Sequence, residues 1–291
     1  MVITVTGSTG TIGSELVRLL SAADTATRAV FRDTKKIQLL PNVVWVQADL
    51  SDSRTLEPAL AGTTRLFLLS GNEPGFGKIQ IDVLYAAEQL GVRHVVKLSA
   101  LGASAHSQSG IALEHYEVEQ ALEKSGMTWT VLRPHSFMQN WLGDVAASVR
   151  EHSVIESPIG DGRVPYIDAR DIAAVAAESL LHLEAHAGHR YFLTGPEAVG
   201  FNDVATELSQ AIGKPVTYRP ISMDEARARM EARGTPKPMI DAYLAISAYQ
   251  KAGGPTSMTS DKVERVLGRP ARSVRDFVRD YARYFTTEPA A

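Results

Sequence analysis

The sequence predicts an α/β protein with a doubly wound parallel sheet and a smaller, mostly helical C-terminal lobe. Two observations lead to this expectation. The chain opens with a β-branched run, a glycine-rich turn and a helical pattern, and apolar runs then alternate with helical patterns as far as about residue 150. Continuous apolar strands that alternate with helices are typical of a parallel sheet covered on both faces.

The opening turn carries three glycines. The strand Val2–Thr6 runs directly into it, and the helix that follows buries one apolar face. Glycines allow a sharp turn and a close approach to a pyrophosphate, and the helix N-terminus offers free N–H groups and a positive dipole end. The spacing GxxGxxG differs from GxGxxG, and the alternative is an ordinary glycine-rich loop. The context favours a Rossmann dinucleotide site formed by Gly7, Thr9, Gly10, Thr11, Ile12 and Gly13.

The end of the second strand, Arg28–Phe31, bears on the choice of nucleotide. An NAD site usually has an acidic residue about 20 residues after the turn, but here Arg32 follows Gly13 by 19 residues, with Lys35 and Lys36 close behind. A guanidinium binds a 2′-phosphate bidentately and stacks on an adenine ring. The sequence therefore favours NADP(H), although Asp33 leaves NAD open as an alternative.

The remaining elements alternate regularly. We expect helices over Ser53–Leu60, over a stripe from Ile79 to Leu90 and around Ile111–Leu122, and strands at Val43–Val46, Arg65–Leu69, His94–Leu98 and Trp129–Leu132. Ligands of parallel sheets bind beyond the carboxyl ends of the strands. We therefore expect further cofactor contacts from Asp49, Leu50, Ser70, Gly71, Ser99, Pro134, His135 and Phe137.

The regular alternation weakens after about residue 150. We expect a cofactor domain over 1–150 and a substrate lobe over 151–291, with 165–195 shared between the two. Within the shared stretch the pattern predicts a strand at Arg163–Ile167, a helix over Asp168–Leu183 and a strand at Arg190–Leu193.

Composition favours a cytoplasmic enzyme that acts on a small molecule. The 291 residues are 44% apolar and 22% charged, and the net charge of −3 gives no reason to expect nucleic acid or a membrane surface as partner. The absence of cysteine excludes disulfides and thiolate chemistry. We see no transmembrane run and no signal peptide, and we expect no metal, because His182 and His186 have no evident third ligand.

Four segments carry a family resemblance. They are the turn Thr6–Gly13, Leu132–Pro134 followed by Phe137–Asn140, Tyr166–Ala173 and Val263–Pro270. Together they resemble the NmrA-like branch of the atypical short-chain dehydrogenases. The resemblance implies an NADP(H)-preferring Rossmann domain with a small substrate lobe. It also covers quinone reductases, a triphenylmethane-dye reductase, tailoring enzymes of aromatic polyketides and redox-sensing regulators.

The catalytic Tyr-x-x-x-Lys pair of typical short-chain dehydrogenases is absent, because Gln120 stands four residues after Tyr116. His115 is the alternative candidate. It lies on the buried stripe of its helix, at a position similar to that of the catalytic lysine in isoflavone-reductase-like enzymes. With an ordinary pKa near 6.5 and Glu119 one turn on, His115 could protonate a reduced carbonyl or quinone oxygen. A structural, hydrogen-bonded histidine is the other interpretation.

The loop after the sixth strand offers a second set of candidates. The resemblance implies that this loop lies near the nicotinamide, so His135 could contact it. Phe137, Met138 and Trp141 could then form an apolar wall for a flat aromatic substrate. The alternative is that the three apolar residues belong to the core.

The function that fits these observations is NADPH-dependent reduction of a quinone or conjugated aromatic carbonyl by direct hydride transfer. Two alternatives remain open. One is a polyketide-tailoring monooxygenase, in which the reduced substrate reacts with O₂ without flavin or metal. The other is an NADP(H)-binding redox sensor that does not turn over.

Overall fold

The structure is a computed structural model that describes residues 1–32 and 37–286. The chain divides into two compact units. The first unit comprises Met1–Pro134, Ala169–Leu193 and Arg265–Gly268, and the second comprises His135–Asp168, Thr194–Glu264 and Arg269–Ala291. The division therefore falls after Pro134, earlier than the expected position near residue 150.

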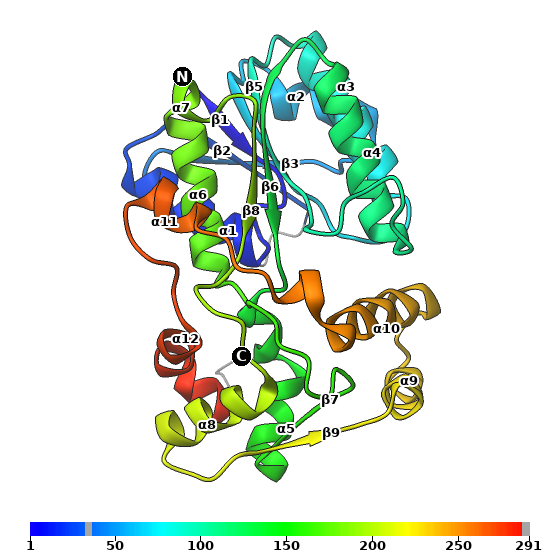
Figure 1. Ribbon diagram of the computed structural model, residues 1–291. Helices are drawn as coiled ribbons and strands as arrows, with labels where there is room; N and C mark the ends of the chain where they lie inside the picture. Colours follow the sequence, from blue (N-terminus) through cyan, green and yellow to red (C-terminus); the bar gives the residue numbers. More distant parts are fainter. Residues whose placement is uncertain (33–36, 287–291) are drawn as a thin grey trace. The chain divides into compact units, whose positions relative to one another are not determined.

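A seven-stranded, fully parallel sheet forms the centre of the first unit (Figure 1). The strand order is β3-β2-β1-β4-β5-β6-β8. The order reverses between β1 and β4, and open sheets of this kind bind ligands at that reversal. The strands are β1 (Ile3–Val5), β2 (Thr27–Phe31), β3 (Val43–Gln47), β4 (Arg65–Leu68), β5 (His94–Leu98), β6 (Thr128–Pro134) and β8 (His189–Leu193).

Helices cover both faces of this sheet. On one face α1 packs against α6, and on the other α4 and α2 both pack against α3 (Figure 1). Because both faces are covered, the strands bury every side chain over Ile3–Val5 and over His94–Leu98. The helices are α1 (Thr11–Ala22), α2 (Ser53–Leu60), α3 (Phe76–Gln89), α4 (Gly110–Lys124), α6 (Ala169–Leu181) and α7 (Leu183–His186). The doubly wound fold predicted from the sequence is thus confirmed.

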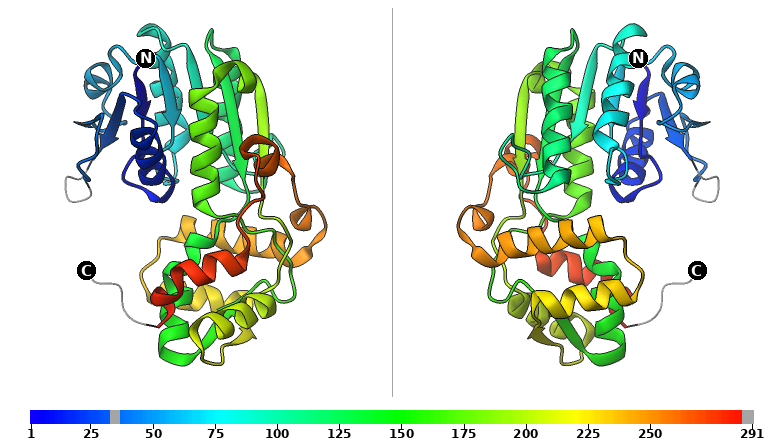
Figure 2. Two further views of the ribbon diagram at one scale, coloured as in Figure 1. Left: turned by 90° about the vertical axis from the view of Figure 1, so that its left-hand side faces the viewer. Right: turned by 90° about the vertical axis from the view of Figure 1, so that its right-hand side faces the viewer.

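The second unit contains a short parallel pair of strands, β7 (Val154–Ser157) and β9 (Thr217–Pro220), and is otherwise mainly helical. Its α9 and α10 lie side by side, packed through Ala226, Ile240 and Leu244 (Figures 1 and 2). Its larger core contains Met138 and Trp141. Its helices are η2 (Met138–Leu142), α5 (Asp144–His152), α8 (Phe201–Ile212), α9 (Met223–Ala232), α10 (Lys237–Ala252), η3 (Gly254–Ser257), α12 (Val274–Tyr281) and η4 (Ala282–Phe285); α11 (Lys262–Leu267) contains a boundary between the units.

The expected strand at Arg163–Ile167 is wrong. The segment makes only two isolated bridges, from Val164 to Val199 and from Ile167 to Phe137. Pro165 lies in its middle, and a proline cannot donate the backbone hydrogen bond that a continuous ladder needs. The helix and strand predicted after this segment are confirmed as α6 and β8.

Candidate functional site

The glycine-rich turn joins β1 to α1 at the carboxyl edge of the sheet. Gly7 has φ +61°, a left-handed conformation that favours glycine. A Cβ atom on Gly13 would lie 2.1 Å from the Gly7 carbonyl oxygen, so the turn itself requires this glycine. Gly10 is different, because it is exposed and the closest atom to an added Cβ would be 3.3 Å away. Gly10 is therefore less constrained by the turn than Gly13, and its exposed backbone can be approached by a ligand.

Hydrogen bonds to neighbouring strands and loops fix the turn, and the N-terminus of α1 is left without a side-chain cap. Thr6 Oγ1 donates to the Leu69 carbonyl at 2.8 Å, and Ser8 Oγ donates to the Val30 carbonyl at 2.5 Å. The N-cap of α1 is Gly10, which has no side chain to satisfy the first N–H groups, and the first turn of α1 contains no acidic residue. An uncapped helix N-terminus of this kind is a site for a phosphate. The turn thus fits the pyrophosphate of a dinucleotide.

Two charged residues follow the next strands along this edge. Arg32, after β2, is exposed, and Asp49, after β3, is exposed as well. Hydrogen bonds from Ser51 lower the pKa of Asp49, and the charge of Arg32 adds a smaller effect in the same direction. The guanidinium is therefore close enough to affect this carboxylate. Three further residues of the sequence argument, Asp33, Lys35 and Lys36, lie outside the described residues.

The other predicted contacts occupy the ends of β4, β5 and β6. Ser70 is half-buried, and its hydroxyl accepts from Gln80 Nε2 at 2.7 Å, while Gly71 is exposed. The hydroxyl of Ser99 donates to Glu119, so it is engaged within the first unit. The Pro134 carbonyl accepts from the Leu101 amide at 3.1 Å. These positions match the expected edge of the sheet, and their contact with a cofactor stays a prediction.

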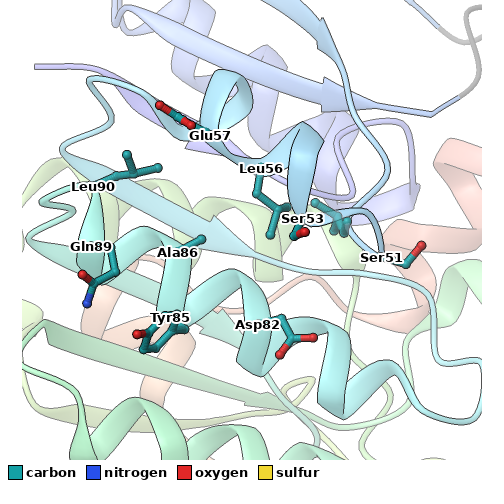
Figure 3. A pocket seen from close by; sticks show the side chains of 10 residues that line it. Ser51, Ser53, Leu56, Glu57, Asp82, Tyr85, Ala86, Gln89 and Leu90 are labelled. Atoms are coloured by element: carbon teal, nitrogen blue, oxygen red, sulfur yellow. The ribbon is translucent and has the colours of Figure 1, made fainter.

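A cavity of about 450 Å³ lies between α2 and α3 (Figure 3). Leu50, one of the predicted cofactor residues, lies on its wall, whereas no residue of the glycine-rich turn does. The remaining lining residues are Ser51, Ser53, Leu56, Glu57, Asp82, Tyr85, Ala86, Gln89 and Leu90. This cavity is therefore distinct from the glycine-rich turn.

His115 is buried on α4, as the helical stripe predicted. Its Nδ1 lies 3.1 Å from Nζ of Lys97, and its ring packs against Phe76 with 4.7 Å between the ring centroids. Burial, followed by the charges of Lys97 and Arg133, lowers the pKa of His115 well below its ordinary value. The expectation of an unperturbed pKa near 6.5 is wrong, because the ring is surrounded by protein and by positive charge. His115 is neutral at neutral pH.

Within the described residues Glu119 makes no hydrogen bond to His115, in contrast to the expectation from their spacing. Its carboxylate, 1% exposed, binds Arg133 bidentately at 2.9 and 2.6 Å and accepts from Arg190 Nε at 3.2 Å and from Ser99. Three donors thus compensate the buried charge. Glu119 joins α4 to β5, β6 and β8. It is a structural carboxylate rather than the group that orients His115.

Lys97 was not among the candidate residues predicted from the sequence. This lysine lies in β5 and is fully buried, and its ammonium donates to the Leu98 carbonyl and to His115 Nδ1. A lysine within the apolar run His94–Leu98 is the signal that could have revealed it, since lysine is almost never fully buried unless it is paired.

In the second unit His135 is also buried. Its Nδ1 accepts from the Ser136 amide at 2.7 Å, and its Nε2 lies 3.1 Å from the Thr256 carbonyl. Burial lowers the pKa of His135 to about 4. Both ring nitrogens are therefore engaged within this unit. Contact between His135 and the nicotinamide stays a prediction.

The apolar residues after His135 belong mainly to the core of the second unit. Met138 and Trp141 are 0% and 4% exposed, and both lie in its large apolar cluster. For these two residues the structure bears out the core interpretation rather than the substrate wall. Phe137 is half-buried immediately before η2, and its contact with a ligand stays a prediction.

Two general findings concern the described residues, 1–32 and 37–286. No cluster of three or more histidine, aspartate or glutamate side chains is arranged to hold a metal ion. None of the helices in these ranges has the length and apolarity that crossing a bilayer requires.

The parallel sheet, the uncapped turn and the order reversal at β1 define a dinucleotide-binding α/β protein. The chain matches the family model described as the NmrA-like family over residues 1–273, and it belongs to that family. The resemblance found in the sequence is confirmed. Membership of this family, together with relatives named as an NAD(P)H azoreductase and quinone oxidoreductases, identifies the chain as an NAD(P)H-dependent oxidoreductase.

Three relatives illustrate the similarity. The chain is 38% identical to an NAD(P)H azoreductase of Xenophilus azovorans, covering 97% of this chain and 99% of the relative. A solved structure of NADPH-dependent quinone oxidoreductase of Escherichia coli with NADPH has a TM-score of 0.85 at 30% identity, covering 96% and 99% of the two chains. A triphenylmethane reductase of Citrobacter sp. with NADP(H) has a TM-score of 0.83 at 26% identity, covering 96% and 99%.

Proposed function

We propose that this protein is an NADPH-dependent reductase that transfers a hydride directly to a quinone or a related conjugated aromatic acceptor, such as an azo dye. The observation that carries the proposal is the β1–α1 turn, with its free helix N-terminus at the reversal of the sheet and an exposed arginine after β2. The azoreductase and quinone oxidoreductase relatives support the choice of acceptor.

Different residues of the first unit would bind different parts of NADPH. The backbone of Gly7, Gly10 and Thr11 would hold the pyrophosphate, and Arg32 would bind the 2′-phosphate. NADPH supplies the hydride when bound. A quinone becomes aromatic on reduction, so hydride transfer to it does not require the Tyr-x-x-x-Lys pair, and the acid chemistry that remains is protonation of the anionic product. His115 would donate a proton from Nε2 to the reduced acceptor.

NADPH oxidation measured with menadione and with methyl red, without oxygen, tests this proposal. We expect one NADPH consumed per menadione reduced, and a parallel titration should show NADPH binding. NADPH binding without turnover on either acceptor would contradict the proposal and favour a redox sensor. Turnover that requires oxygen and yields a hydroxylated product would contradict it in favour of a monooxygenase.

A further inference from the structure

Lys97 occupies a position in the sheet where an apolar residue is expected. It pairs with Leu68 of β4 on one side and with Val131 of β6 on the other, in the middle of the parallel sheet. Its side chain is fully buried. Its ammonium donates to the Leu98 carbonyl and to His115 Nδ1, neither of which is a carboxylate. A buried ammonium without a carboxylate partner is costly, and such groups concentrate at functional sites.

The contact between Lys97 and His115 determines which ring nitrogen carries the proton. A charged lysine has only donors, so His115 Nδ1 must accept from it. The neutral ring then carries its proton on Nε2. In the described chain the buried side-chain polar atoms without a partner are Gln80 Oε1, Ser148 Oγ and Thr256 Oγ1. His115 Nε2 is not among them and makes no hydrogen bond within the described residues, so this nitrogen contributes to the 4% of the residue that is exposed.

A neutral imidazole cannot donate from Nε2 without compensation. Loss of that proton leaves an imidazolate, which is strongly basic, unless Nδ1 gains a proton at the same time. Lys97 is the group that can provide this proton, because its ammonium already donates to Nδ1 at 3.1 Å. The contact between Lys97 and Nδ1 therefore provides the proton that a neutral histidine needs at Nδ1 when it donates from Nε2.

We propose that Lys97 is a positioning residue that fixes the tautomer of His115 and replaces the proton that His115 gives away. The proposal rests on the proposed function. In the step, the Nε2–H bond of His115 breaks as a bond forms to the anionic oxygen or nitrogen of the reduced acceptor. One N–H bond of the Lys97 ammonium breaks as an Nδ1–H bond forms, and its electron pair stays on Nζ. Lysine ends as a neutral amine, histidine stays neutral, and the acceptor loses its negative charge.

Several charged groups surround this pair. Glu119 of α4 is the carboxylate whose charge acts on Lys97, and it is bound by Arg133 of β6 and Arg190 of β8. Arg133 also acts on His115, while α3 presents the aromatic ring of Phe76. The other helix that packs on these strands, α6, lies on the opposite face of the sheet (Figure 1).

The proposal predicts a pH dependence with a defined sign. Burial lowers the pKa of Lys97 to about 7, and the charge of Glu119 opposes part of this change. The protonated lysine is the proton source. The relay is therefore intact below this pKa and is lost as the pH rises through about 7.

Lys97→Met and Lys97→Gln test the proposal in kinetics with menadione. For the wild type we expect kcat to fall as the pH rises through about 7. Lys97→Met should lower kcat at acidic pH by roughly 10²-fold, leave NADPH affinity unchanged and remove the pH dependence. Lys97→Gln keeps a donor but has no ammonium, so it should also lose the pH dependence. Lys78→Met removes an exposed lysine of α3 and is the matched control, which should behave as the wild type.

A second readout does not depend on turnover. Nitrogen NMR of histidine-labelled protein without nucleotide should show the Nε2–H tautomer of His115 in the wild type and in Lys97→Gln, and a mixture in Lys97→Met. An unchanged tautomer and an unchanged pH profile in Lys97→Met would overturn the proposal. A fully active His115→Gln would refute the relay and leave the reductase function intact. If the wild type reduces no acceptor, the proposed function fails, and the tautomer alone decides the Lys97–His115 pairing.

Discussion

We expect single residues at the carboxyl edge of the sheet to determine which nucleotide the turn selects. Arg32 is the clearest case, because its guanidinium is exposed and its charge acts on Asp49, which follows the neighbouring strand. A basic and an acidic group thus follow adjacent strands. The arginine suits a 2′-phosphate, whereas a carboxylate suits a free ribose hydroxyl.

Replacement of Arg32 should separate the two nucleotides. We expect Arg32→Ala to weaken NADPH binding by about 1–3 kcal/mol, the contribution of a charge-assisted contact, and to leave NADH binding nearly unchanged. Fluorescence titration with both nucleotides measures this difference. Arg54→Ala, which removes an exposed arginine from α2, is the control. Equal losses for both nucleotides would show that Arg32 does not bind the 2′-phosphate.

For single residues of the site, the sequence predicted the burial of His115 but not its pKa or its partners. The helical stripe correctly placed His115 in the interior. Its lowered pKa could not be predicted, because its causes are burial and charges from Lys97 and Arg133, which come from two other elements. The spacing of four residues suggested Glu119 as its partner. Instead the Glu119 carboxylate accepts hydrogen bonds from the guanidinium groups of Arg133 and Arg190.

Among the elements, the β1–α1 turn combines a packing requirement with a binding surface. Gly7 and Gly13 are fixed by contacts within the protein, with Leu69 next to Gly7 and the Gly7 carbonyl next to Gly13. Gly10 has no positive φ, and an added Cβ would lie 3.3 Å from the Gly7 carbonyl oxygen, so a side chain there requires a shift of only a few tenths of an ångström. The three glycines of one motif therefore have two different reasons to be glycine.

Two substitutions in the turn should give opposite results. Gly10→Val should keep the melting temperature close to that of the wild type and abolish NADPH binding, because the branched side chain fills the space over the helix N-terminus. Gly13→Ala should lower the melting temperature, since its Cβ would overlap the Gly7 carbonyl oxygen. Thermal melts and NADPH titration measure both effects. Wild-type NADPH affinity in Gly10→Val would rule out this turn as the phosphate site.

Prediction of the elements succeeded where a pattern was long and uninterrupted. The apolar runs of β4 and β5 and the stripes of α3 and α4 were recognised from sequence, because burial on both faces or on one helical face dictates those patterns. The failure at Arg163–Ile167 had a local cause in Pro165. The apolar side chains of this segment are buried, but its backbone forms only isolated β-bridges and no continuous hydrogen-bonded strand pair.

On the scale of the whole molecule, the sequence predicted the first unit far better than the second. The parallel sheet follows from alternating strand and helix patterns, each of which is encoded locally. The second unit is assembled from separated stretches, His135–Asp168, Thr194–Glu264 and Arg269–Ala291, and its strands β7 and β9 pair across about 60 residues. Pairing at such a distance leaves no local signal in a single sequence.

The central claim is that bound NADPH gives its hydride to a conjugated aromatic acceptor on this protein. Rapid mixing of the protein–NADPH complex with menadione, in the absence of oxygen and with less NADPH than protein, tests it most directly. We predict that the nicotinamide absorbance disappears in a single phase, at a rate that falls when the transferred hydrogen is deuterium. Gly10→Val should not show this phase. A complex that binds NADPH fully and keeps it unoxidised in the presence of menadione would contradict the claim.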